Sequence, residues 1–125
     1  MTLDDINFIR QELRKLDNNI TDGYLSFGNL QFVLDFVQDI HNDLPYDESL
    51  IAKAAYLFWN LIHAHAFPEG NKRIAFTSLM TFLRINGKRM NISNREAFEY
   101  TLSVYNNNYT QDEIKAWITQ NILNI

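Results

Sequence analysis

The sequence predicts an all-α fold, a compact bundle of six helices. Apolar residues recur at intervals of three and four along most of the chain, which is the spacing of one helix face. Two capping boxes, Ser93 with Glu96 and Thr110 with Glu113, mark helix beginnings in the C-terminal third. No stretch alternates with period two for long enough to predict a full strand, although residues 88–91 have the character of a short extended piece.

Three helices are predicted in the first half of the chain. An apolar stripe behind a capping-box-like start at Thr2 and Asp5 predicts a helix over residues 3–16. A second helix follows a break at residues 17–23 and ends near His41. Asp47 is the expected N-cap of the third helix, whose apolar stripe continues as far as His65. The inward residues of this third helix are Ile51, Ala54, Ala55, Phe58, Leu61 and Ile62.

Three more helices are predicted in the second half. The fourth runs over residues 71–85, and Gly87 supplies its left-handed stop. The fifth begins after Ser93 and ends at about Tyr105, and the sixth begins after Thr110. The expected inward residues of the fourth helix are Ile74, Ala75, Ser78, Leu79 and Phe82.

Composition narrows the class of protein. A chain of 125 residues with 46% hydrophobic residues can bury one core, so a single domain over residues 1–125 is expected. Because cysteine is absent, neither disulfides nor zinc–thiolate sites are available. No apolar run approaches the roughly 20 residues that cross a bilayer, and the N-terminus is acidic, so a cytoplasmic protein with no membrane contact is expected. A net charge of −4 argues against a long nucleic-acid groove.

The most informative segment is residues 65–73, His-Ala-Phe-Pro-Glu-Gly-Asn-Lys-Arg. It ends with Lys72 and Arg73 in the first turn of a predicted helix, where the helix dipole makes each cation cost about 0.3–1 kcal/mol. A bound anion would offset that cost, because it uses the side-chain charges and the free backbone donors together. A phosphate group is the obvious candidate.

The rest of the segment supplies the other groups that phosphoryl chemistry needs. His65 is a candidate general base, since its ordinary pKa near ~6.5 leaves it neutral in the cytosol. Phe67 is the expected anchor of the loop, and Glu69 is a candidate Mg²⁺ ligand. Gly70 allows close approach of a ligand, and Asn71 can both cap the helix and bind a phosphate oxygen.

Each of these residues also has an ordinary structural explanation. A histidine at a helix end is usually a hydrogen-bonded core residue, a lone loop glutamate is usually solvated, and a Lys-Arg pair is usually surface charge. The joint spacing in nine residues between two amphipathic helices favours the functional interpretation. His63 lies about 200° around the helix from His65, so the two do not share a metal on one face, and a structural or surface role is expected for His63.

The segment from His65 to Arg73 closely resembles the signature of the Fic/Doc superfamily, HxFx(D/E)GN(G/K)R. Residues 85–90 are similar to the turn that follows the family's motif, and residues 116–118 are similar to its final helix, so the resemblance covers Gly23 to the C-terminus. Ala66 departs from the proline common in the family. Lys72, where the larger Fic branch usually has glycine, resembles the death-on-curing (Doc) branch. Phe76 stands where the Fic branch has a second arginine.

The resemblance implies a function and a set of roles. His65 would deprotonate the target hydroxyl, and Glu69 would hold Mg²⁺. The phosphates of ATP or another nucleoside triphosphate would be bound by the four residues that follow, Gly70, Asn71, Lys72 and Arg73. Doc-type members transfer the terminal phosphate, whereas Fic-type members transfer AMP. The chain contains no inhibitory (S/T)xxxE(G/N) motif. The resemblance therefore implies a separate antitoxin, and a target such as translation elongation factor Tu.

Three functions follow in order of preference. The first is a Doc-like toxin of a toxin–antitoxin pair that phosphorylates a Ser or Thr hydroxyl of a target protein and blocks translation. The second is a Fic-like protein adenylyltransferase, which performs AMPylation. The third is a non-catalytic module that keeps the pocket only to bind a nucleotide or a partner.

Overall fold

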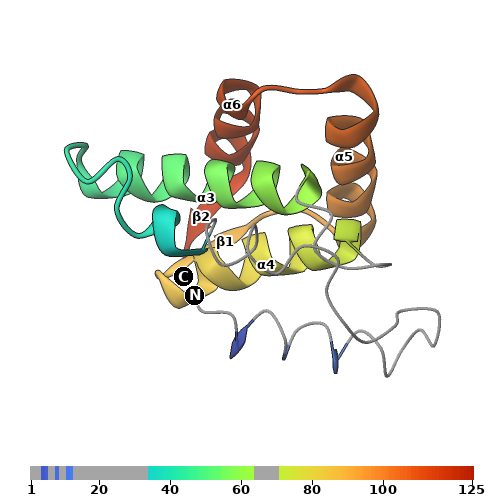
Figure 1. Ribbon diagram of the computed structural model, residues 1–125, viewed down its shortest axis with the longest axis horizontal. Helices are drawn as coiled ribbons and strands as arrows, with labels where there is room; N and C mark the ends of the chain where they lie inside the picture. The colour runs from blue at the N-terminus through green and yellow to red at the C-terminus, as the bar shows by residue number, and fades with distance from the viewer. Residues whose placement is uncertain (1–3, 6–7, 9–10, 13–33, 64–70) are drawn as a thin grey trace.

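In a computed structural model, the described residues are 4–5, 8, 11–12, 34–63 and 71–125 (Figure 1). Helix accounts for 74% of them, which confirms the predicted helical class. The four long helices are α3 (Tyr46–His63), α4 (Asn71–Ile85), α5 (Asn94–Asn107) and α6 (Gln111–Asn121). The predicted count of six is slightly off, since the described residues form five helices. Residues 4–5, 8 and 11–12, which fall in the first predicted helix, are helical, and so are residues 34–37.

The helices pack around α3. Helix α4 runs alongside α3, α5 contacts both of them near the C-terminal end of α3, and α6 packs against α3 nearer its middle (Figure 1). Most residues predicted for the inner faces of α3 and α4 are buried, with Phe58 and Leu79 at 0% exposure, and the core also contains Leu57 and Leu83, which were not predicted. Ile51 differs from the prediction, because it is only partly buried at the edge of the core. Burial of the facing stripes is therefore what holds α3 and α4 together.

A small sheet is the feature that the all-α prediction missed. Strands β1 (Lys88–Met90) and β2 (Ile122–Asn124) pair antiparallel, with Arg89 opposite Leu123. The short extended piece at 88–91 was expected, but its partner follows α6 and is too short to show a period of two. The sheet ties the chain end to the turn after α4, where Gly87 has the predicted left-handed conformation with φ 81°.

The start of α3 differs from the prediction. The helix begins at Tyr46, and the Ser49 N–H donates to the Pro45 carbonyl at 2.8 Å, so Pro45 and not Asp47 precedes the first turn. Asp47 lies inside that turn, where its carboxylate forms an ion pair with Lys88 at 3.2 Å. An acid there still suits the electropositive helix start.

Helices α5 and α6 begin as predicted. The Glu96 N–H donates to the Ser93 hydroxyl at 3.1 Å, and α6 begins with a full capping box between Thr110 and Glu113. Helix α5 extends to Asn107, slightly beyond the predicted end, and Asn108 closes it in a left-handed conformation with φ 53°. The second predicted helix ends earlier than expected, at residue 37, and turns lead from there to His41.

Candidate active site

The candidate site lies where α3 ends and α4 begins. Helix α3 ends at His63, and α4 begins at Asn71, which is the start that the sequence predicts. The residues between them lie outside the described part of the chain, and they include four predicted site residues: His65, Phe67, Glu69 and Gly70. Their predicted roles therefore remain predictions, and the geometry below concerns the two helix ends that flank them.

The first turn of α4 carries no acidic residue. Its second and third residues are Lys72 and Arg73, and both are partly buried. Helices α3, α5 and α6 each have at least one acid in the first turn, so α4 alone among these four begins with positive charge. Four backbone N–H groups at a helix start also lack partners within the helix, so this turn is electropositive from two sources.

Lys72 is held by an aromatic ring. Its Nζ lies over the face of Tyr105, 4.4 Å from the ring centroid, in a cation–π contact. Tyr105 belongs to the last turns of α5, and the C-terminal end of a helix favours a nearby cation. The fold therefore supplies part of the compensation for Lys72 that the sequence argument assigned to an anion. Arg73 also makes an interaction within the chain.

His63 has a structural role, as expected. Its Nδ1 lies 2.8 Å from the Trp59 carbonyl oxygen, which can only accept, so Nδ1 carries the proton and donates. The imidazole stacks on the Trp59 ring at 4.2 Å between centroids, and Tyr105 lies on another side at 6.4 Å. These contacts fix the last turn of α3, from which the motif segment departs.

An aromatic layer behind His63 joins α3 to α5 and α6. Trp59 Nε1 donates to the Tyr109 carbonyl at 3.0 Å, and Tyr100 stacks on Trp117 with 3.7 Å between ring centroids. Burial, with the nearby Tyr109 and Glu113, raises the pKa of Tyr100 to about 12. The phenol therefore stays neutral at physiological pH, and the layer acts as packing.

Sequence reasoning missed Tyr105 as a site residue. Tyr105 belongs to the site because its ring contacts Lys72, although most of α4 and α5 separates the two residues in sequence. One signal was present in the sequence. Tyr105 directly precedes three asparagines at the end of α5, and a tyrosine in such a polar helix end is expected to be exposed. The predictions for Phe58, Trp59, Phe76 and Phe82 as core or rim residues are confirmed.

No group of three or more His, Asp or Glu side chains that could hold a metal occurs in the described ranges. The predicted ligand, Glu69, lies outside them. A single carboxylate is nevertheless chemically suited to Mg²⁺, which takes one or two carboxylates together with phosphate oxygens. Among the described helices, none combines the length and the apolar character needed to cross a bilayer.

Comparison with known families identifies the relationship. The model of the Fic/DOC family matches residues 1–83, about two thirds of the chain, including all of the motif, α3 and most of α4. The chain belongs to the Fic/Doc family. The match starts before Gly23 and stops near the end of α4, so the resemblance predicted for α5 and α6 lies beyond it. A search of curated proteins found no match.

Fic/Doc membership supports a coarse enzymatic assignment. Family members are generally transferases that move a nucleoside monophosphate or a phosphate, with nucleoside triphosphates as co-substrates. The family therefore suggests a Fic-type transferase that acts on a target protein. The match does not distinguish the Doc branch from the Fic branch.

Proposed function

We propose that the chain is a Doc-like toxin that transfers the terminal phosphoryl group of a nucleoside triphosphate to a Ser or Thr hydroxyl of a target protein. The observation that carries the proposal is the start of α4, where Lys72 and Arg73, the last two residues of the motif, occupy a turn without an acid. A cytoplasmic target of the translation apparatus, such as elongation factor Tu, and control by a separate antitoxin belong to the same proposal.

Lysine at position 72 supports phosphate transfer over AMP transfer. A lysine side chain fills space that a glycine leaves open, and its ammonium adds a charge on the phosphate side. The nucleotide would therefore bind in the direction opposite to the one it has in AMP-transferring members. Its contact with Tyr105 restricts where the ammonium can reach, and the planar fork of Arg73 complements it as a second type of phosphate ligand.

Phe76 supports the same direction. It lies one turn after Arg73, where an AMP-transferring member has a second arginine, and its ring packs edge-to-face against Phe98 at 6.3 Å. This position of α4 therefore contributes to the contact with α5. A hydrophobic residue in that contact offers nothing to a nucleotide phosphate.

In the proposed reaction, the target hydroxyl oxygen attacks the γ-phosphorus, and the bond to the β,γ-bridging oxygen breaks. His65 takes the hydroxyl proton, and the nucleoside diphosphate leaves with the bridging oxygen. Gly70, Asn71, Lys72 and Arg73 hold the phosphate oxygens, through backbone N–H groups and the two cations. Bound at Glu69, Mg²⁺ would neutralise charge on the phosphates.

Mass spectrometry of a target protein incubated with the chain, ATP and Mg²⁺ tests the proposal. The expected product carries one added phosphoryl group on a Ser or Thr residue. An added AMP would contradict phosphate transfer and would establish the adenylyltransferase instead. A target that stays unmodified while the chain binds ATP would support the non-catalytic module.

A further inference from the structure

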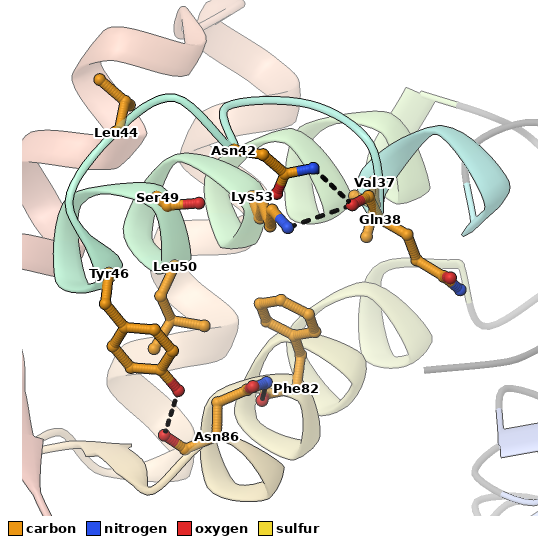
Figure 2. A pocket seen from close by; sticks show the side chains of 10 residues that line it. All are labelled: Val37, Gln38, Asn42, Leu44, Tyr46, Ser49, Leu50, Lys53, Phe82 and Asn86. Atoms are coloured by element: carbon orange, nitrogen blue, oxygen red, sulfur yellow. Dashed lines mark hydrogen bonds between the residues drawn. The ribbon is translucent and has the colours of Figure 1, made fainter.

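A second candidate site lies at the opposite end of the α3–α4 pair. A cavity of about 450 Å³ opens between the turn at residues 37–44, the first turns of α3 and the end of α4 (Figure 2). Leu50 lines it, and at a rise of about 1.5 Å per residue it lies about 20 Å along α3 from His63. The cavity is therefore separate from the candidate active site, and its volume is typical of small-molecule sites.

The lining of the cavity carries a single positive charge. Among the described residues that line it, Lys53 is the one charged side chain, and none is an aspartate or a glutamate. The ammonium donates to the Gln38 carbonyl at 3.2 Å, and Asn42 Nδ2 donates to the same oxygen at 3.2 Å (Figure 2). Within the described ranges no carboxylate pairs with Lys53. An ammonium has three N–H donors, so two are left for a ligand.

A second donor lies on the same wall. Ser49 is one turn before Lys53 on α3, so the two side chains share a helix face. No hydrogen bond joins the Ser49 hydroxyl to another described residue, and the residue is 8% exposed. Apolar surface comes from Phe82, which projects from α4, and from Leu50 on α3 (Figure 2). The cavity thus combines two donors, a net positive charge and an apolar surface.

We infer that this cavity binds a small organic carboxylate with an apolar body. A carboxylate only accepts, and its two oxygens match the Lys53 ammonium and the Ser49 hydroxyl as charge-assisted partners. The apolar body would lie against Leu50 and Phe82. The first turn of α3 carries two acids, Asp47 and Glu48, and neither is among the described residues that line the cavity. Asp47 is paired with Lys88 at 3.2 Å. This inference is independent of the proposed transferase.

Titration of the full chain with 3-phenylpropionate, followed by NMR, tests the inference. The expected result is saturable shifts at Leu50 and Phe82, with the uncharged match 3-phenylpropionamide binding at least about tenfold more weakly. Lys53→Met keeps the aliphatic stem and should weaken the carboxylate at least about tenfold. Lys115→Met, at an exposed lysine 3.8 Å from Asp112, should leave binding unchanged. Ser49→Ala should weaken it by a smaller factor.

Three results would overturn the inference. They are the absence of saturable shifts around Leu50, equal binding of the acid and the amide, and unchanged affinity in Lys53→Met. Circular dichroism of each variant shows that the helices are intact, so a loss of binding is not mistaken for unfolding. Nucleotide binding at the start of α4 is measured on the same samples, and it should be the same in Lys53→Met and in the unchanged protein.

Discussion

Helices α6 and α4 begin in opposite ways. Helix α6 starts with a complete capping box, in which the Glu113 N–H donates to the Thr110 hydroxyl at 3.2 Å and the Glu113 carboxylate accepts from the Thr110 N–H at 3.3 Å. Helix α4 starts with Lys72 and Arg73 and no acid. The first arrangement stabilises a helix by itself, whereas the second is unfavourable to the helix. The start of α6 is capped for stability, whereas the start of α4 has the positive charge that the proposed phosphate site requires.

The largest expected effect comes from His65, the first residue of the motif that leads into α4. His65→Ala should lower phosphate transfer at least about 100-fold, because a positioned general base contributes about 10²–10⁴-fold. ATP binding should survive, since His65 acts on the acceptor hydroxyl. Growth arrest on expression, compared with binding measured by calorimetry, checks both effects. Arrest that persists unchanged would show that proton abstraction by His65 is not the activity.

A change in the capping box of α6 should lower stability and leave the transfer activity unchanged. Thr110→Ala removes the hydroxyl that accepts from the Glu113 N–H, and should lower the free energy of unfolding by about 1 kcal/mol. Transfer and ATP binding should stay unchanged at temperatures where the variant is folded. Urea unfolding measures the first effect. A loss of ATP affinity in the folded variant would mean that the two helix starts are not separable.

The contact between Lys72 and Tyr105 should have a smaller effect. In a double-mutant cycle with Lys72→Met and Tyr105→Leu, the coupling in the free energy of unfolding should be about 0.5–1 kcal/mol, because the ring at 4.4 Å compensates the cation. Tyr105→Phe keeps the ring face and serves as the matched control, with coupling retained. Zero coupling would contradict the claim that the Tyr105 ring compensates the charge of Lys72.

The smallest expected effect concerns the stability contribution of Tyr100, whose ring stacks on Trp117 of α6, and it appears only in alkaline solution. Burial, Tyr109 and Glu113 raise the pKa of Tyr100 from 10.0 to about 12 in the folded chain. Between these values the unfolded chain loses the phenol proton first, so the stabilising contribution is complete below pH 10 and is lost as pH rises toward 12. Tyr100→Phe should lose less stability than the unchanged protein between pH 9 and 11 in urea unfolding. Equal losses would contradict the raised pKa.

Most of the fold could be predicted because its signals are local. The stripes of α3 and α4, the capping boxes at Ser93 and Thr110, and the left-handed Gly87 each depend on residues within about one or two turns. Strand β2 could not be predicted, because it forms by pairing with β1, which is far away in the chain. The residue that precedes α3 was misplaced by two positions, Asp47 in place of Pro45, since the Pro45 carbonyl accepts the first helical bond.

The motif of the candidate site could be found in the sequence, but the contacts that its residues make in space could not be predicted. The motif gave the positive start of α4, and the family match confirms the relationship. Tyr105 was missed, because no spacing rule joins a residue at the end of α5 to one at the start of α4. The cavity beside Lys53 was missed for the same reason, since its walls come from three separate segments of the chain.

The most direct test of the central claim is calorimetric titration of a non-hydrolysable ATP analogue with Mg²⁺ into the chain and into Arg73→Ala. Arg73→Ala should bind the analogue at least about tenfold more weakly, because a charge-assisted contact to phosphate contributes about 1.5–3 kcal/mol. Thr110→Ala, at the start of α6, should bind like the unchanged protein. Equal affinity in Arg73→Ala, with its helices intact by circular dichroism, would contradict a phosphate site at the start of α4.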